Sequence, residues 1–338
     1  MKLILIGFGA VGQGFAEILL EKCADLSARH QFSADIVGVV TASKGNLYHP
    51  DGLDIAHLLR TAATGSFMDY PESEPLRRDW DASDMIRRGS AHVLLEASPT
   101  NLQTGQPALA TCHLALDQGL HIVLANKGPV ALDYASLREK AAAAGLHMRY
   151  EATVMAGTPT MHLAEDALAG CEIRSARGIL NGTTNYILTQ MESGMTYAEA
   201  LAQAQALGYA ETDPAGDVEG WDAAGKGLIL ANALFGSSLT MHDLDVTGIT
   251  DISSRDVDQA RQSGQRYKLI AEARPDGGAV SPQRLPLSDP LTSVGGSTNA
   301  ITLDTDLLGR VTLIGAGAGK LETGYALLAD LMAIQRAT

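Results

Sequence analysis

The sequence predicts an α/β protein whose N-terminal part contains a doubly wound parallel sheet and whose C-terminal part is an α+β domain. Three observations support this prediction. Short apolar runs alternate with helical patterns up to about residue 150, and a glycine-rich turn joins the first run to the first helix. Beyond that point helices and strands no longer alternate regularly. Regular alternation of strands and helices is typical of a parallel sheet covered on both faces.

The elements can be assigned in chain order from their periodicity. In the N-terminal part we expect the strands KLILI, DIVGVV, HVLLEAS and HIVLAN, and helices over 10–29, ALATCHLALDQG and YASLREKAAAAG, leading to HMRYEATV. In the C-terminal part we expect helices near 159–169, 183–192, 196–207 and 219–235, among strands such as CEIRSARGIL and RYKLIAEARP. The polar stretch 275–299 contains several Gly and Pro residues and is predicted to form loops.

Composition and charge exclude several classes of protein. The 338 residues are 46% apolar and 19% charged, which suits a well-filled globular core. A net charge of −14 opposes binding to nucleic acid or to an anionic membrane. Cys23, Cys112 and Cys171 lie far apart, and the histidines show no metal-binding spacing, so neither a disulfide framework nor a zinc site is expected. The apolar start is too short for a signal peptide or membrane span, which predicts a cytoplasmic protein.

The turn GFGAVGQG lies directly between the first strand and the first helix. Gly7 permits a tight turn, Gly9 lets the backbone approach a pyrophosphate, and Gly12 lets the helix pack on the strand. Ala10 and Val11 begin the helix, whose N-terminus favours an anion. This context predicts dinucleotide binding and a Rossmann domain, although an ordinary glycine turn is the alternative.

The end of the second strand indicates which dinucleotide is bound. Proteins that bind NAD usually carry an acidic residue there, which binds the ribose. In this chain the strand ends in VVTASKG, which has Thr41, Ser43 and Lys44 at that place and no acidic residue. The absence of a carboxylate favours NADP(H), with NAD(H) as the alternative. Lys44 could equally be a solvated loop lysine, which would leave the preference open.

Two further strand ends are expected to contribute to the site. Ala97 and Ser98 follow one strand in EASPTN, and Asn126 and Lys127 follow another in HIVLAN. Ligands of doubly wound sheets bind outside the carboxyl ends of the strands, so we expect the nicotinamide and the substrate there. The alternative is a helix-capping loop with a solvated Lys127. Gly317, in GAGAGK, is interpreted as a glycine turn near the cofactor, because this segment lacks the pattern of a P-loop.

The segment ETDPAGDVEGWDAAGK carries an excess of acid beside one lysine. Asp222 and Lys226 lie one turn apart on one face of the expected helix, with Glu211 and Asp217 in the loop before it. A surface ion pair is the alternative explanation. Carboxylates without matching bases suit a cation such as a substrate ammonium group. Because Lys226 begins an apolar run, its stem should be buried and its amine held in place, where it can give a proton to a forming alkoxide.

Together these motifs resemble those of homoserine dehydrogenase. The matching segments occur in the family's order: GFGAVGQG, EASPTN, LANKGP, RYEATVMAGTP, GILNGTTNYIL, GYAETDPAGDVEGWDAAGK and GAGAGKLETGYALLADL. The resemblance is to the short form without kinase or ACT domain, so threonine feedback through such a domain is not expected. One departure is Thr323-Gly324, where the family usually has Thr-Ala; Glu322 beside it is expected to alter the fit of the cofactor.

The resemblance implies reversible, NAD(P)-linked interconversion of L-aspartate 4-semialdehyde and L-homoserine, on the route to threonine and methionine. It assigns the proton transfer to Lys226 or to Lys127, with Asp222 orienting Lys226. Glu211 and Asp217 would hold the substrate amino group. Thr183 and Tyr209 would also lie at the substrate. The alternatives are a reductase of a related amino-acid semialdehyde or hydroxy amino acid, and a non-catalytic dinucleotide-binding sensor.

The resemblance also implies a monovalent cation, such as Na⁺, bound by main-chain carbonyls of the segment with Glu151, Val154, Ala156 and Thr158. It further implies a homodimer, with a tetramer as the alternative. The expected division of the chain is a cofactor domain over residues 1–135, a substrate-binding and dimerisation domain over 136–310, and a C-terminal segment over 311–338 that returns to the cofactor domain.

Overall fold

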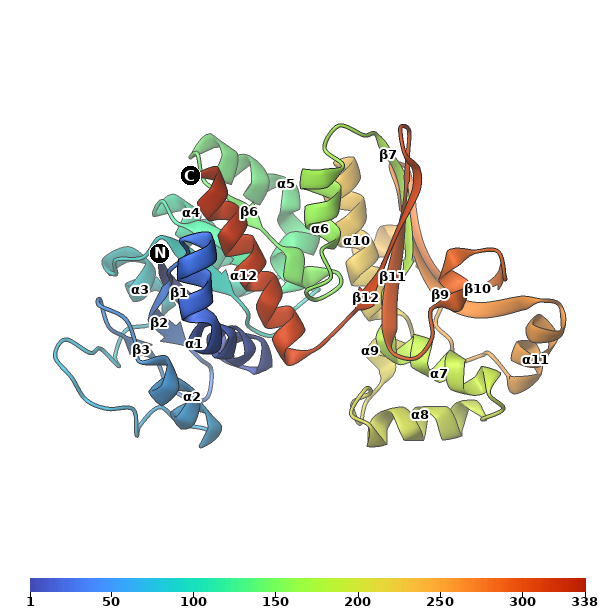
Figure 1. The fold of residues 1–338 in the computed structure, drawn as a ribbon, viewed down its shortest axis with the longest axis horizontal. Helices are drawn as coiled ribbons and strands as arrows, with labels where there is room; N and C mark the ends of the chain where they lie inside the picture. The colour runs from blue at the N-terminus through green and yellow to red at the C-terminus, as the bar shows by residue number, and fades with distance from the viewer. The chain divides into compact units, whose positions relative to one another are not determined.

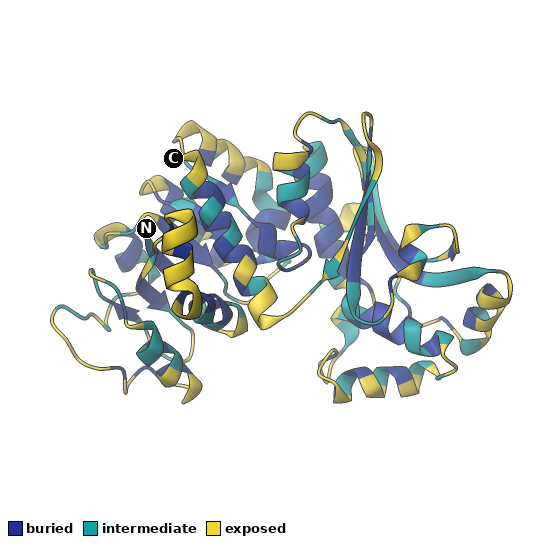
Figure 2. Cartoon of the chain, in the orientation of Figure 1, coloured by how far each residue is buried: buried dark blue, intermediate teal, exposed yellow.

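A computed structural model describes the whole chain, Met1–Thr338. The chain folds into two compact units (Figure 1): Met1–Gly157 together with Gly319–Thr338, and Thr158–Ala318. In Figure 2 the buried residues of each unit gather on its sheet and on the helices packed against it. None of the helices combines the length and the apolar character that a membrane span requires.

Six strands form the sheet of the first unit, in the order β3-β2-β1-β4-β5-β6. They are β1 (Lys2–Ile6), β2 (Asp35–Val40), β3 (Leu47–Tyr48), β4 (Val93–Glu96), β5 (His121–Leu124) and β6 (Met148–Arg149). Neighbouring strands are parallel except β2 and β3, which are antiparallel. The strand order reverses between β1 and β4, and such a switch point is where doubly wound sheets bind ligands.

Helices cover both faces of this sheet, as its apolar strands require. They are α1 (Ala10–His30), α2 (Ile55–Ala63), α3 (Ala82–Arg88), α4 (Ala108–Asp117), α5 (Lys127–Ala143) and α12 (Lys320–Ala337). Helix α1 packs against α2 and α12, whereas α4 packs against α3 and α5. This arrangement confirms the predicted doubly wound fold.

The C-terminal helix α12 belongs to the core of the first unit and lies beside α1 in Figure 1. Two glycines allow the close approach. A Cβ on Gly14 would lie 2.1 Å from the carbonyl oxygen of Lys320, and one on Gly324 would lie 2.5 Å from the backbone nitrogen of Phe15. Glycine is therefore required at position 324 because a side chain there would prevent α12 from packing closely against α1. Lys320 Nζ also contacts Glu17 Oε1 at 2.5 Å.

Replacing Gly324 with alanine is expected to lower the free energy of unfolding by about 1–3 kcal/mol. Alanine gains about 1 kcal/mol in helix propensity, but its Cβ would overlap backbone atoms of α1 that cannot move independently. Chemical denaturation would measure the difference. Gly216→Ala is the matched control, because a Cβ at Gly216 meets nothing within 4 Å. Equal stability of Gly324→Ala and the control would contradict the packing argument.

The boundaries between the units differ from those expected from the sequence. The first unit continues beyond residue 135 to Gly157, because α5 extends to Ala143 and β6 adds a further parallel strand to the same sheet. The second unit continues beyond residue 310 to Ala318, because residues 309–316 form one of its strands. Only the helix α12 returns to the first unit.

The second unit contains a mixed sheet in the order β12-β11-β7-β9-β10-β8. Its strands are β7 (Ile173–Ile179), β8 (Leu244–Val246), β9 (Gln265–Arg274), β10 (Gly277–Pro286), β11 (Thr298–Thr305) and β12 (Gly309–Ala316). All neighbours are antiparallel except β10 and β8. This sheet and its helices confirm the predicted α+β domain.

Helices α10, α7 and α11 pack on this sheet. The helices of the second unit are α6 (Thr160–His162), α7 (Gly182–Glu192), α8 (Tyr197–Ala206), α9 (Ala215–Val218), α10 (Trp221–Phe235) and α11 (Ser254–Gln262). Short turns complete the chain: 3-10 turns at Glu151–Thr153, Met241–Asp243 and Pro290–Ser293, and a π-helical turn at Leu163–Ala167. The turn at Glu151–Thr153 replaces most of the strand expected from HMRYEATV.

The prediction of loops over 275–299 was wrong, because this stretch contains β10 and the start of β11. Strand β10 pairs with β9 along its whole length, whereas β8 covers only Gly278–Val280. Beyond Val280 the strand is an edge, and proline is tolerated at a sheet edge because it needs no hydrogen bond on the open side. Pro282 and Pro286 therefore interrupt the sequence pattern without interrupting the strand.

Candidate functional site

The glycine-rich turn has the conformation that its sequence predicts. Gly7 has φ = +93°, and a Cβ there would lie 2.4 Å from the carbonyl oxygen of Ala97. A Cβ on Gly12 would lie 2.7 Å from the carbonyl oxygen of Gly7. At Gly9, by contrast, a Cβ would meet nothing within 4 Å. Gly7 and Gly12 close the turn, and Gly9 leaves open space above it.

A cavity of about 620 Å³ opens above this turn. It is lined by Ile6, Gly7, Phe8, Gly9, Ala10, Val11, Val40, Thr41, Ala42, Ser43, Lys44, Glu96, Ala97, Ser98, Pro99, Thr100, Pro107, Thr111 and Ala125. Nine of the residues predicted to bind the cofactor are in this lining, and Gly12, Asn126, Lys127 and Gly317 are not. Glu96 and Thr111 were missed: Glu96 begins the EASPTN segment but was not singled out in it, and Thr111 belongs to no recognisable motif. The volume, the open glycine and the switch point suit a dinucleotide.

The loop after β2 is fixed by its own polar groups. Thr41 Oγ1 donates to the carbonyl oxygen of Gly45 at 2.8 Å and accepts from the backbone N–H of Lys44 at 2.9 Å. The backbone N–H of Thr41 donates to Asn46 Oδ1 at 3.2 Å. No carboxylate from this loop lines the cavity. Because the Thr41 hydroxyl is bonded within the loop, Ser43 and Lys44 supply the hydroxyl and ammonium groups that the loop adds to the lining.

A polar cluster lies at the ends of β4 and β5. Ser98 donates to Glu96 Oε1 through both its hydroxyl and its backbone N–H. Asn126 Nδ2 donates to Ser98 Oγ at 3.1 Å, and its Oδ1 accepts from the N–H of Gly128 at 2.9 Å. Asn126 thus caps α5 while it supports the cavity wall from behind. Lys127 is the first residue of α5, and its backbone N–H donates to Thr100 Oγ1 at 3.3 Å.

In the second unit the predicted lysine and carboxylate are paired and buried. Lys226 is only 8% exposed. Its Nζ donates to Asp222 Oδ2 and to the carbonyl oxygen of Leu180, both at 2.7 Å. The second acceptor comes from the residue after β7, so the amine is held between two elements. The alternative of a solvated surface ion pair is thereby excluded.

Asn181 joins this pair to a second carboxylate. Its Nδ2 donates to Asp217 Oδ1 at 2.7 Å and to Asp222 Oδ2 at 3.0 Å. Its Oδ1 accepts from the N–H of Thr184 at 2.9 Å and so caps α7. Sequence reasoning missed this residue, although it begins the NGTT segment that carries part of the resemblance. We call Asn181, Asp217, Asp222 and Lys226 the carboxylate–lysine cluster.

The electrostatics of the cluster favour a cationic ligand. Burial raises the pKa of Asp217, and the neighbouring Asp222 raises it further, whereas the hydrogen bond from Asn181 and the charge of Lys226 lower it. With both carboxylates ionised, two negative charges face one positive charge, which leaves one negative charge. A bound ammonium group would neutralise that charge.

The remaining predicted substrate residues lie on the segments around the cluster. Thr183 Oγ1 donates to the carbonyl oxygen of Tyr209 at 2.6 Å. The ring of Tyr209 packs edge-on against Tyr186, with centroids 5.1 Å apart. Glu211 is exposed, and its carbonyl oxygen accepts from Gln205 Nε2 at 3.1 Å. Its carboxylate is therefore accessible to a ligand from solvent.

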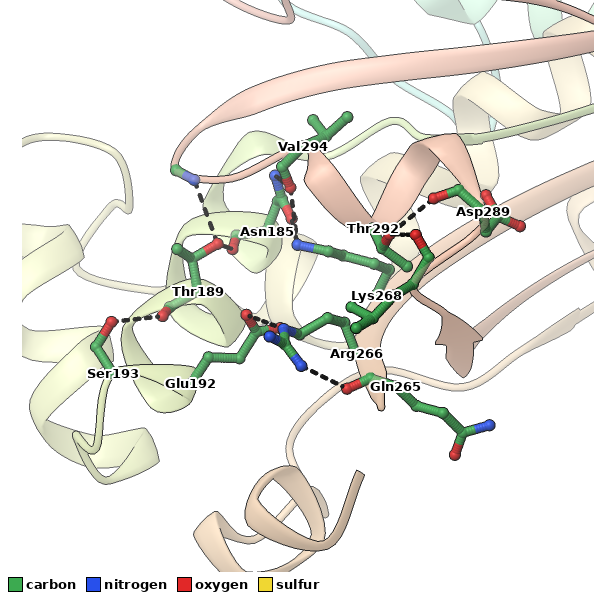
Figure 3. A network of polar contacts seen from close by, with 12 residues as sticks. Asn185, Thr189, Glu192, Ser193, Gln265, Arg266, Lys268, Asp289, Thr292 and Val294 are labelled. Atoms are coloured by element: carbon green, nitrogen blue, oxygen red, sulfur yellow. Dashed lines mark hydrogen bonds and ion pairs between the residues drawn. The ribbon is translucent and has the colours of Figure 1, made fainter. Parts of the chain in front are cut away.

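Helix α7, which carries Asn181, is anchored by a second buried lysine (Figure 3). Lys268 is 1% exposed and its Nζ donates to Asn185 Oδ1 at 3.1 Å and to the carbonyl oxygen of Val294 at 2.7 Å. Burial lowers the pKa of Lys268, and nearby Glu192 opposes that effect. Asn185 lies one turn after Asn181, so these contacts fix the end of α7 that enters the cluster.

The segment implied to bind a cation has an unusual backbone. Glu151, Val154 and Ala156 are buried in the first unit, and the N–H of Glu151 donates to Asp330 Oδ2 at 3.0 Å. Ala156 has φ = +49°, a conformation that residues other than glycine rarely adopt and that is often found at ligand-binding turns. Thr158 begins the second unit, and its Oγ1 donates to the carbonyl oxygen of Ala316 at 2.9 Å. No group of three or more His, Cys, Asp or Glu side chains is placed to hold a metal ion.

The chain combines a doubly wound fold, a glycine-lined cavity at the switch point of its sheet, and a buried lysine–carboxylate pair. Together these features indicate an NAD(P)-dependent oxidoreductase. Comparison with known proteins specifies the family. The family model for homoserine dehydrogenase matches residues 159–332. The chain therefore belongs to the homoserine dehydrogenase family, whose members act on a CH–OH group, and the predicted resemblance and enzyme class are confirmed.

Individual relatives match along almost the whole chain. An NAD(+)-dependent homoserine dehydrogenase of Pseudomonas canavaninivorans is 41% identical over 99% of this chain and 96% of its own length. A homoserine dehydrogenase of Methanocaldococcus jannaschii is 40% identical over 100% of this chain and 99% of its own. The solved structure of a hyperthermophilic archaeal homoserine dehydrogenase in complex with NADPH superposes with a TM-score of 0.84 at 26% identity, covering 100% of this chain and 98% of that one.

Proposed function

We propose that this enzyme catalyses the reversible, NAD(P)H-dependent reduction of L-aspartate 4-semialdehyde to L-homoserine, a step toward threonine and methionine. The observation that carries the proposal is the carboxylate–lysine cluster, which combines a held proton donor with unbalanced negative charge. The ammonium group of L-aspartate 4-semialdehyde requires the negative charge, and its aldehyde group requires the proton donor. Membership of the family supports the same reaction.

The carboxylates bind and orient the substrate in this proposal. Asp217 and Glu211 accept hydrogen bonds from the ammonium group, which supplies the positive charge that the cluster lacks. Thr183 and Tyr209, joined by their hydrogen bond, form the neighbouring wall. Charge-assisted hydrogen bonds of this kind fix an orientation more firmly than neutral ones do.

Lys226 donates the proton. A reduced nicotinamide, when bound, would supply the hydride for the aldehyde carbon, so that negative charge would develop on the aldehyde oxygen. The ammonium of Lys226, held by Asp222 and the carbonyl oxygen of Leu180, stabilises that charge and transfers a proton to it. Lys127, at the start of α5, is the alternative donor.

The cofactor cavity favours NADP(H) over NAD(H). Gly9 and the N-terminus of α1 would receive the pyrophosphate, with Thr41, Ser43 and Lys44 near the adenosine ribose. Without a carboxylate after β2, a 2′-phosphate meets no repulsion and finds the ammonium group of Lys44. Known relatives show that both dinucleotides are used in the family, since one is NAD(+)-dependent and another binds NADPH.

Two further features complete the proposal. A monovalent cation such as Na⁺ would be held by main-chain carbonyls of Glu151, Val154, Ala156 and Thr158, and would stabilise the positive φ of Ala156. The protein would form a homodimer through its second unit, whose edge strand β12 contains no buried residue. Light scattering should give about twice the chain mass of 35.5 kDa, and a monomer at micromolar concentration would contradict the dimer.

The decisive experiment is reduction of NADP⁺ and of NAD⁺ with L-homoserine as the only added substrate, followed by the absorbance of the reduced nicotinamide. Turnover with a higher kcat/KM for NADP⁺ is expected. Binding of a dinucleotide without turnover of homoserine would contradict the proposed substrate and lead to a panel of other semialdehydes and hydroxy amino acids. A protein inert toward that whole panel would be a sensor.

A further inference from the structure

A buried carboxyl group lies directly behind the wall of the cofactor cavity. Glu96 ends β4, is 0% exposed and belongs to the cavity lining. Its Oε1 accepts from the hydroxyl and the N–H of Ser98, and Asn126 Nδ2 lies 3.5 Å away. Because Ser98 lines the cavity and Asn126 caps α5, this one oxygen holds together the two strand ends that form the wall.

The other oxygen of the same carboxyl group has no hydrogen-bond partner, although it is fully buried. An unpartnered oxygen that carries half of a negative charge would be very unfavourable in such surroundings. A neutral carboxylic acid avoids most of that cost and still accepts at Oε1. A neutral O–H without an acceptor costs less than a buried charge without a partner, so the neutral acid is the favoured form of Glu96.

We propose that Glu96 is a positioning residue for the dinucleotide, and that it acts as a neutral carboxylic acid that keeps the wall with Ser98 in its binding conformation. The inference rests on the proposed use of the cavity for NAD(P)H. The Oε2 of Glu96 is buried and has no partner, whereas its Oε1 is bonded to Ser98. Glu96 acts through Ser98 and Asn126.

The surroundings of Glu96 contain no positive charge that would stabilise its ionised form. The groups that act on it are Ser98 in the following loop and Asn126 at the start of α5, and it acts in turn on the buried thiol of Cys112 on α4. Burial raises the pKa of Glu96, against smaller opposing effects of the hydrogen bonds from Ser98 and Asn126. Burial also raises the pKa of the neighbouring Cys112 thiol, so this group adds no charge beside Glu96.

The raised pKa of Glu96 determines how the stability of the folded protein changes with pH. The folded protein holds the proton of Glu96 more tightly than the unfolded chain, so stability declines as pH rises above about 4.3, the ordinary pKa of glutamate. The decline ends once pH passes the raised pKa that Glu96 has in the folded protein. Above that point the ionised carboxyl group should loosen the wall and weaken dinucleotide binding.

The test compares wild type with Glu96→Gln and Glu96→Ala, by fluorescence titration with NADPH and NADH between about pH 6 and about pH 9. Glutamine is neutral at every pH and keeps the acceptor, so it should restore the binding that alanine loses. The wild-type Kd should rise by up to about tenfold per pH unit above the pKa of Glu96, while that of Glu96→Gln stays level. Glu21→Gln, on the exposed side of α1, should follow the wild-type profile.

Two binding results would overturn the inference. One is that Glu96→Gln binds the dinucleotide about tenfold more weakly than wild type at the lower pH, and the other is that Kd changes with pH in the same way for both proteins. Thermal unfolding without dinucleotide gives a second readout. Wild type should lose more stability than Glu96→Gln on going to alkaline pH, and equal losses would also overturn it. If wild type binds neither dinucleotide, the proposed function fails, and the unfolding comparison still decides the state of Glu96.

Discussion

Replacing Lys226 with methionine is expected to lower kcat for homoserine oxidation by about 10²–10⁴-fold, the usual contribution of a positioned acid or base. Methionine matches the apolar stem of the lysine but cannot exchange a proton with the substrate oxygen. Binding of the dinucleotide should stay within about twofold, because Lys226 does not line the cofactor cavity. Steady-state kinetics and fluorescence titration would measure the two quantities separately.

The matched comparisons for this variant are Lys127→Met and Lys140→Met. Lys140 is paired with Asp117 at 2.8 Å on the first unit and should tolerate the change with unaltered kcat. If Lys127→Met loses kcat while Lys226→Met keeps it, the proton donor is Lys127 instead. A rise in KM alone for Lys226→Met would mean that the lysine binds substrate without taking part in the transition state.

Replacing Gly7 with alanine should be the most damaging single change in the first unit. Alanine at φ = +93° carries a strain of about 1–3 kcal/mol, and its Cβ would lie 2.4 Å from the carbonyl oxygen of Ala97. Both effects together predict a loss of about 3 kcal/mol or more in the free energy of unfolding. Any folded protein should bind the dinucleotide at least about tenfold more weakly, because Ala97 and Ser98 must move.

Gly65→Ala separates the two contributions to this loss. Gly65 has φ = +84°, but a Cβ there meets nothing within 4 Å, so only the conformational strain applies. Chemical denaturation of both variants, with dinucleotide titration of the folded fraction, would measure the difference. Equal losses of stability would show that contact with the strand end of β4 contributes nothing at Gly7.

The sequence predicts those parts of the site that depend on neighbours along the chain. The turn around Gly7 follows from local backbone geometry, and the pair of Asp222 and Lys226 follows from helical spacing. Asn181 could not be assigned in this way, because its partners lie on α9 and α10 and become neighbours only in the folded unit. The same holds for Glu96, whose buried environment comes from residues of three separate segments.

In the fold, too, the elements that depend on their own sequence could be predicted, whereas those that depend on distant parts of the chain could not. Most strands and helices predicted for the first unit are confirmed because each carries its own periodic pattern, whereas β3, α2 and α3 were not predicted. Strand β10 was missed because its prolines indicate a loop unless it is known to lie at a sheet edge. The extent of the first unit was also underestimated, since nothing in the sequence of β6 shows which sheet it joins.

The position of α12 has a consequence for how this protein is made. Its residues Leu327, Leu328, Leu331 and Ile334 share one buried core with side chains of β1 and α1. A growing chain on the ribosome presents β1 before α12, with the whole second unit emerging in between. The core of the dinucleotide-binding unit therefore cannot close before α12 has emerged, whereas the second unit already has its complete sequence available to fold.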